Sequence, residues 1–153
     1  MVQYIPKGFH TITPYLCIEN ATKTIEFLKK AFDVQECNVC SQTPNGQIMH
    51  AEIKIGDSWI MIGEAQPPTH AATPSKLYLY VPDTDKVYKQ AMSAGGTSVR
   101  EPEDMFYGDR NAAVKDPSGN EWWIATHIED VSPEEVEKRA HAANSKKEAA
   151  AAR

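Results

Sequence analysis

The chain has 153 residues and a mass of 17.0 kDa, a size that suits one domain or two very small ones. Its net charge of −5, with no basic stripe, argues against nucleic acid as a partner. No apolar run approaches the roughly 18 residues that would cross a bilayer, and the N-terminus has no secretory-signal pattern. We therefore expect a cytoplasmic protein with neither a nucleic-acid nor a membrane partner.

The sequence repeats itself at a fixed offset of 63 residues. Such an offset indicates one supersecondary unit used twice. We expect a single domain over 1–130, with half-units of about 8–64 and 75–127, and then a C-terminal helix and tail over 131–153. Identical residues that keep this register are Tyr15 and Tyr78, Leu16 and Leu79, Gly56 and Gly119, and Trp59 and Trp122.

The first unit reads as a strand, a helix and three more strands. The first strand is expected over 11–18, and Asn20 is a suitable N-cap for a helix with an apolar stripe that ends at Phe32. Further strands are expected near 34–40, 47–55 and 58–62. Gly56-Asp57 forms the turn between the last two.

The second unit repeats this order. A strand over 77–81 precedes a helix that Asp83 caps and that Gly95-Gly96 ends. Strands then follow near 97–100, 111–115 and 121–126. The proline-rich stretch 66–75 reads as a linker between the units.

A third helix is predicted at the C-terminal end of the chain. Ser132-Pro133 opens it with a capping box. It has almost no large apolar residue, so we expect it to fray near 149–153.

The alternation of side chains along the strands separates two faces. One face is apolar, which predicts that it forms the core under the helices. Trp59, Met61 and Trp122 fall on this apolar face. The other mixes aromatic, acidic and histidine side chains, which is typical of a cavity lining, although an exposed sheet face is also mixed. We favour a cavity because so much aromatic area needs cover. This mixed face includes Thr13, Tyr15, His50, Glu52, Ile60, Tyr78, Tyr80, Glu121 and Trp123.

The three cysteines predict reduced thiols, since their number is odd and no secretory signal is seen. Cys37 and Cys40 form a C-x-x-C pair, but in a strand-like stretch rather than at a helix start, where the thiol pKa would be lowered. No second pair completes a zinc site. We interpret the cysteines as buried or incidental.

The duplicated β-α-β-β-β pattern resembles the vicinal oxygen chelate superfamily, which includes glyoxalase I, bleomycin-resistance proteins, fosfomycin-resistance enzymes and extradiol dioxygenases. The stretches that carry the resemblance are TPYLCIENATKTIEFLKKAF, EDMFYGDR and VKDPSGNEWWIATHIED. They look most like the uncharacterised glyoxalase-like bacterial subgroup. The resemblance implies an α+β fold, with two tandem β-α-β-β-β units that form a cupped mixed sheet, plus a C-terminal helix. It also implies a homodimer, and the cup can come from one chain or from two.

The resemblance also bears on cofactors. Catalytic members hold a divalent metal on the first and last strands of each unit. The corresponding positions here are Thr13, Ile60, Lys76 and Trp123, none of them a usual ligand, so we expect no cofactor. A divalent metal at relocated ligands is the alternative. Its ligands would be His50, Glu52 and Glu121, with His10 and His127 as further candidates.

The loop over 104–110 is a second candidate element. Phe106, Tyr107 and Arg110 on it could close over a ligand, and Arg110 could hold a carboxylate or phosphate in a bidentate clamp. The alternative for Arg110 is an ion pair with Asp109 or Asp116 that pins the loop.

These features predict a glyoxalase-like, bleomycin-resistance-like protein that binds a small, partly aromatic organic molecule in a β-cup. The alternatives are a metal-dependent lyase or isomerase of the glyoxalase type, and a purely structural or interaction domain. No catalytic residue is assigned, and whether the protein is an enzyme stays open. The expected ligand-binding residues are Tyr15, His50, Glu52, Tyr78, Tyr80, Tyr107, Arg110, Glu121 and Trp123.

Overall fold

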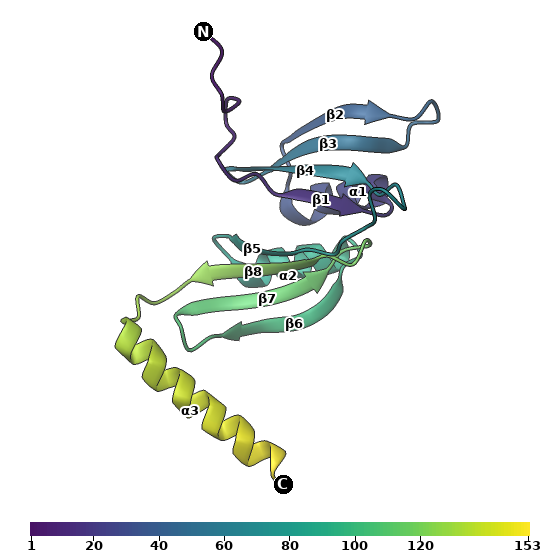
Figure 1. Cartoon of the computed structure of the whole chain (residues 1–153). Coiled ribbons are helices and arrows are strands. Elements are labelled where there is room, and N and C mark those ends of the chain that lie inside the picture. Colours follow the sequence, from purple (N-terminus) through teal and green to yellow (C-terminus); the bar gives the residue numbers. More distant parts are fainter.

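Each half of the chain folds into a four-stranded mixed sheet with a helix on one side, as seen in the computed structural model of residues 1–153 (Figure 1). The first sheet has the order β1-β4-β3-β2 and the second β5-β8-β7-β6. In each, the first and last strands of the unit pair in parallel and the other neighbours are antiparallel. The predicted α+β fold of two tandem units is confirmed.

The elements follow one another in the predicted order. The first unit contains β1 (Tyr15–Ile18), α1 (Ala21–Phe32), β2 (Glu36–Gln42), β3 (Ile48–Ile55) and β4 (Ser58–Glu64). The second contains β5 (Lys76–Tyr80), α2 (Thr84–Ser93), β6 (Thr97–Asp104), β7 (Asp109–Lys115) and β8 (Glu121–His127). Helix α3 (Pro133–Ala151) follows, and none of the three helices is long and apolar enough to cross a bilayer.

Several boundaries differ from the prediction. Strand β1 begins at Tyr15, so Thr13 precedes the sheet. Strands β6 and β7 are longer than expected, which shortens the predicted loop over 104–110 to a turn at 105–108. Helix α3 continues to Ala151 and does not fray near 149. It needs little burial for this, because Ser132 caps its first turn and Arg139 pairs with Glu135 one turn away.

The start of α1 is held by the sheet rather than by its own cap residue. Asn20 occupies the N-cap position as predicted, but it is left-handed (φ 60°) and its side chain makes no cap bond. The Glu64 carboxylate at the end of β4 instead accepts hydrogen bonds from the backbone N–H groups of Asn20 (3.0 Å) and Ala21 (2.6 Å). A carboxylate at a helix N-terminus complements the helix dipole. Asp83 caps α2 as predicted.

The core runs through both half-units. Phe32 at the end of α1 lies 5.3 Å from Trp122 on β8, measured between ring centres. Trp122 is buried and donates its indole N–H to Asp116 (2.9 Å), whose carboxylate also accepts from Asn120 in the turn between β7 and β8. The apolar face that the sequence predicted therefore forms one core beneath α1 and α2, except in β4.

In β4 the predicted faces are reversed. Ile60 and Ile62 lie in the core, whereas Trp59 and Met61 lie on the opposite face. The reason is the two-residue turn Gly56-Asp57, which pairs Ile55 with Ser58 and so places alternate β4 residues, from Ser58 on, on the core side. A slip of one residue in strand register moves every side chain to the other face.

The two units are also not aligned by one constant offset. Leu16 and Leu79 are 63 residues apart, but their strand partners Ile62 and Ile124 are 62 apart. The counterpart of Trp122 in the first unit is therefore Ile60, not Trp59. The recurrence of Gly-x-x-Trp in the sequence does not reflect equivalent positions. Trp59 packs instead on Phe9, with ring centres 5.3 Å apart.

This assignment of β4 can be tested by a pair of neighbouring substitutions. We expect Ile60→Ala to lower the free energy of unfolding by about 2–4 kcal/mol, because it leaves a cavity in a core that cannot fully collapse. Met61→Ala, at a partly exposed position on the other face, should cost less than half as much. Urea unfolding curves measure both losses. A greater loss for Met61→Ala would contradict the register.

Candidate functional site

The predicted site residues lie mainly on the sheet faces that the helices do not cover. On the first sheet, strand pairing brings Tyr15 beside Met61 and Met61 beside Glu52. On the second, it brings Tyr78 beside Trp123 and Tyr80 beside Ala125. We call these surfaces the first face and the second face. The first face consists of Tyr15, Cys17, Cys40, His50, Glu52, Lys54, Trp59 and Met61. The second consists of Tyr78, Tyr80, Arg100, Asp109, Asn111, Glu121, Trp123 and His127.

Tyr15 and His50 lie together on the first face. Their rings are stacked with centres 5.6 Å apart, and the tyrosine hydroxyl lies 3.4 Å from Nδ1 of His50. Tyr15 crosses Gly63, where any Cβ would collide with the tyrosine ring and hydroxyl. The glycine therefore lets the aromatic ring lie flat along the sheet beside the imidazole.

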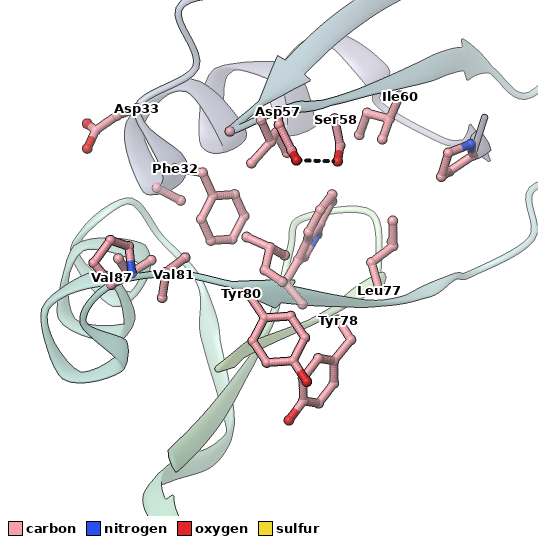
Figure 2. Close-up of a pocket in the computed structure, with 17 residues that line it drawn as sticks. Phe32, Asp33, Asp57, Ser58, Ile60, Leu77, Tyr78, Tyr80, Val81 and Val87 are labelled. Carbon is pink, nitrogen blue, oxygen red and sulfur yellow. Dashed lines mark hydrogen bonds between the residues drawn. The ribbon is translucent and has the colours of Figure 1, made fainter. Parts of the chain in front are cut away.

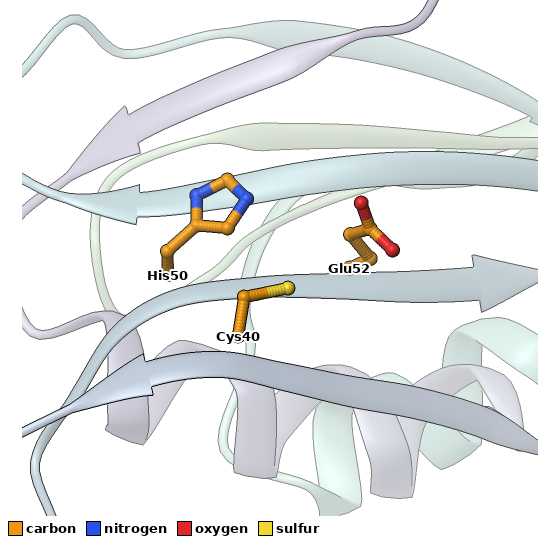
Figure 3. Close-up of side chains that lie close together, drawn as sticks. All are labelled: Cys40, His50 and Glu52. Atoms are coloured by element: carbon orange, nitrogen blue, oxygen red, sulfur yellow. The ribbon is translucent and has the colours of Figure 1, made fainter. Parts of the chain in front are cut away.

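Cys40, on β2, forms a cluster with His50 and Glu52 of β3 on the first face (Figure 3). One sulfur, one ring nitrogen and one carboxylate oxygen all lie within 4.8 Å of one another. Partial loss of water around the sulfur, and then the charge of Glu52, raises the pKa of the Cys40 thiol. Cys40 is exposed rather than buried. The sequence shows it only as part of a C-x-x-C pair and gives no sign of the cluster, which depends on the pairing of β2 with β3.

The second face has a buried carboxylate, Asp109, at the start of β7. Asp109 accepts hydrogen bonds from the hydroxyls of Tyr78 (2.8 Å) and Tyr80 (3.0 Å) on one oxygen. Nδ1 of His127 lies 2.9 Å from its other oxygen. Burial by itself would raise the pKa of Asp109, but the bonds to His127, Tyr78 and Tyr80 outweigh it and lower the pKa.

Asn111 carries the one buried side-chain nitrogen or oxygen atom that has no hydrogen-bond partner. The residue is fully buried, its amide nitrogen donates to Tyr107 (2.6 Å) and Tyr78 (3.3 Å), and its oxygen Oδ1 accepts from nothing. The hydroxyl hydrogen of Tyr78 is donated to Asp109, so Tyr78 can only accept from Asn111, which fixes the orientation of the amide. An unsatisfied buried acceptor costs about 1–3 kcal/mol unless a donor reaches it.

Trp123 lies among charged groups on the second face. Lys76 and Arg100 both lie over its ring, 5.2 Å and 5.3 Å from the ring centre, and its indole N–H donates to Glu121 (3.1 Å). This hydrogen bond, and then the ion pair with Lys76 (3.1 Å), lowers the pKa of Glu121. Within one chain Glu121 is therefore engaged on the second face and is not brought to His50 and Glu52.

Arg110 lies on the helix side of the second sheet. It donates two hydrogen bonds to Asp85 on α2 (2.6 and 2.9 Å) and one to Asp104 (2.9 Å), which raise its pKa. The ion pair expected with Asp109 or Asp116 does not form. Arg110 thus ties β7 to α2 and does not reach the second face. Tyr107, from the same predicted loop, does reach it.

Sequence reasoning missed three members of the second face. These are Asp109 and Asn111, at alternate positions on β7, and Arg100 on β6, none of which the mixed-face prediction includes. Strand alternation would have placed Asn111 beside Ala125 once the pairing of β7 with β8 was known. Ile60, expected on the mixed face, lies in the core, and His10 precedes β1 in an exposed position.

Both faces are open to solvent within one chain. Tyr15 is 55% exposed, Tyr78 45% and Tyr80 67%. A cleft of about 730 Å³ lies between the half-units and is lined mainly by apolar groups such as Phe32, Leu79 and Val87. Tyr78 and Tyr80 of β5 also border it. Figure 2 shows the Tyr78 and Tyr80 rings on the side of β5 away from Phe32. One chain therefore does not enclose the predicted cup.

Comparison with known proteins identifies the family. The sequence profile of the Glyoxalase/Bleomycin resistance protein/Dioxygenase superfamily matches residues 8–124. The chain belongs to this superfamily. An uncharacterized protein of Mycobacterium bovis is 31% identical over 136 residues, with 82% of this chain and 89% of the relative covered. One of Mycobacterium tuberculosis has the same identity, with 79% of its own length covered.

Solved structures share the superfamily fold. TioX from Micromonospora sp. ML1 superimposes with a TM-score of 0.64 at 21% identity, over 78% of this chain and 99% of that one. A glyoxalase-related enzyme from Fulvimarina pelagi gives 0.60 at 16% identity, over 76% and 87%. These likenesses establish the fold of this glyoxalase-superfamily chain and nothing finer.

The histidine at the edge of the second face should titrate unusually. Hydrogen bonds to Asp130 (2.8 Å) and then to Asp109 raise the pKa of His127. Since protonation strengthens both contacts, the stabilisation they supply is present below the ordinary histidine pKa and is lost as pH rises through the raised value. We expect Asp130→Asn to move the pKa of His127 back towards 6.5, as measured by NMR of the ring protons.

The control for this titration is Glu134→Gln, which removes the same charge from a nearby position that forms no ion pair. It should leave the His127 titration unchanged. An unaltered titration in Asp130→Asn, or an equal shift in both variants, would disprove the assignment.

Proposed function

We propose that this chain is a small-molecule-binding protein of the glyoxalase/bleomycin-resistance type, and that its binding cup forms when the first face of one copy covers the second face of another. The observation that supports this most directly is the exposure of Tyr15, Tyr78 and Tyr80 on two faces left uncovered by the helices. Large exposed aromatic areas with polar surroundings mark binding or association surfaces.

A two-fold dimer would use both faces at once. In a closed dimer the two copies make the same contacts. The first face of one copy then meets the second face of its partner, and the reverse contact forms the other cup. Each cup would combine Tyr15 and His50 from one copy with Tyr78, Tyr80 and Trp123 from the other. The site is therefore incomplete without the partner copy.

The polar groups of the second face indicate the class of ligand. Oδ1 of Asn111 needs a hydrogen-bond donor. Arg100, half-buried over Trp123, forms no ion pair, whereas Lys76 beside it is paired with Glu121. A planar aromatic molecule with an N–H or O–H donor and a carboxylate would match the tyrosine rings, Asn111 and Arg100 together. The proposed ligand is thus a small aromatic acid.

Indole-2-carboxylate is a suitable probe because it combines all three features. We expect isothermal titration to detect its binding, and Tyr80→Leu or Asn111→Leu to weaken the affinity at least tenfold. Arg100→Gln should weaken binding of the carboxylate but not of indole-2-carboxamide. Tyr4→Leu is the matched control, since Tyr4 is almost fully exposed outside the sheets. No binding, or equal losses in the control, would reject this ligand class.

The origin of the cup in two chains can be tested by mixing variants. We expect light scattering to give twice the 17.0 kDa mass of one chain. Tyr15→Ala and Tyr80→Leu would each damage every cup of their own homodimer. After unfolding and refolding together, about a quarter of the cups should bind the probe normally, because each mixed dimer has one intact pair of faces. A monomer, or no recovery on mixing, would contradict a cup built from two chains.

A metal-dependent isomerase of the glyoxalase type is the second candidate. The observation that favours it is the approach of His50 and Glu52 on the first face. The test is isomerisation of the hemithioacetal of methylglyoxal and glutathione with added Zn²⁺ or Ni²⁺. Turnover that requires the metal and disappears in His50→Ala would show that the chain is an isomerase rather than a binding protein. If no turnover is seen, the isomerase is rejected and the binding function is retained.

A further inference from the structure

We infer that Cys40, His50 and Glu52 on the first face form a binding site for one Zn²⁺ ion. Their ligand atoms converge within 4.8 Å (Figure 3). In a tetrahedral zinc site, with Zn–S of about 2.3 Å and Zn–N and Zn–O of about 2.0 Å, ligand atoms are about 3.3–3.5 Å apart. Small side-chain rotations therefore suffice to reach that geometry from the observed positions.

An irregularity in β2 brings the sulfur to the other two groups. Val39 pairs with Ala51 and Ser41 pairs with His50, so Cys40 is an extra residue between two regular pairs. Such bulges redirect a side chain and are frequent next to functional sites. Cys40 thereby lies across from the two β3 side chains, His50 and Glu52, which share a face because they are two residues apart on one strand.

The other cysteine of the C-x-x-C pair takes no part. Cys37 pairs with Ile53 of β3, a core residue, and packs against the core. The site is therefore not a dithiol.

Charge also favours a divalent cation here. Glu52 is half-buried and forms no ion pair, while the nearby Lys54 is paired with Glu36 at 3.0 Å. With the thiol deprotonated, Cys40 and Glu52 carry two negative charges and His50 is neutral. One divalent ion balances them, and it removes the repulsion between the thiolate and the carboxylate.

The types of ligand indicate which metal fits. A thiolate, an imidazole and a carboxylate together suit zinc, whereas magnesium and calcium prefer oxygen ligands alone. Tyr15 stacks on His50 and lies near its Nδ1, which holds the ring in the way that outer groups orient metal-bound histidines. Three protein ligands leave a fourth position open, as in zinc sites that bind a further molecule.

The zinc site does not depend on the proposed ligand or on the dimer. All three ligands come from one chain, and metal affinity is measured without indole-2-carboxylate. A chain that binds zinc but no aromatic acid would overturn only the proposed function, and the opposite result would overturn only the zinc site.

The experiment uses the full chain, purified without chelator and titrated with Zn²⁺ against a chromophoric chelator. We expect one zinc per chain, and affinity at least a hundredfold lower in Cys40→Ser, His50→Ala and Glu52→Gln. Cys37→Ser and Glu36→Gln are the matched controls, with a thiol and a carboxylate removed from the same strand, and should bind as the wild type does. Substoichiometric zinc, or an equal loss in the controls, overturns the proposal.

Two further readouts hold even if a ligand variant folds poorly. Co²⁺ in the wild-type chain should give a thiolate-to-cobalt charge-transfer band that Cys37→Ser retains. Zinc should slow the alkylation of Cys40 by iodoacetamide, located by mass spectrometry, and leave the alkylation of Cys37 unchanged. A missing band, or equal protection of the two cysteines, overturns the proposal.

Discussion

The packing of α1 against α2 is the contact on which the rest of the structure depends. The amide of Gln90 on α2 donates to the backbone oxygen of Lys30 and to Asp33 at the end of α1. Phe32 continues this contact into the second unit through Trp122. Because one helix covers one side of each sheet, both sheets bury that side in a shared core and leave the other side without cover.

This constraint explains why the polar and aromatic groups collect where they do. A sheet face without a helix cannot remain a continuous apolar surface in water. The second face resolves this with Asp109, whose carboxylate organises Tyr78, Tyr80 and His127. The first face carries a stacked tyrosine and histidine beside an unpaired carboxylate. The two faces are chemically different, which suits the proposed pairing of one with the other.

The contrast between Arg110 and Asn111 shows how strand position decides function. They are neighbours in sequence, yet they point to opposite sides of β7. Arg110 is held by Asp85 and Asp104 and serves the contact with α2. Asn111 lies on the second face with an unpaired oxygen. The residue with the more conspicuous chemistry in the sequence is therefore structural, and its neighbour is the candidate for ligand contact.

Local patterns in the sequence determined the repeated unit, its order of elements, the caps at Asp83 and Ser132, and the mixed composition of the faces that carry Tyr15, Tyr78, Tyr80 and Trp123. These features depend on residues close together in the chain, where turn chemistry and side-chain alternation act directly. Tertiary structure alone decided the core position of Ile60, the capping of α1 by Glu64, and the approach of Cys40 to His50 and Glu52. Each depends on the register between strands, and a shift or bulge of a single residue changes which side chains meet.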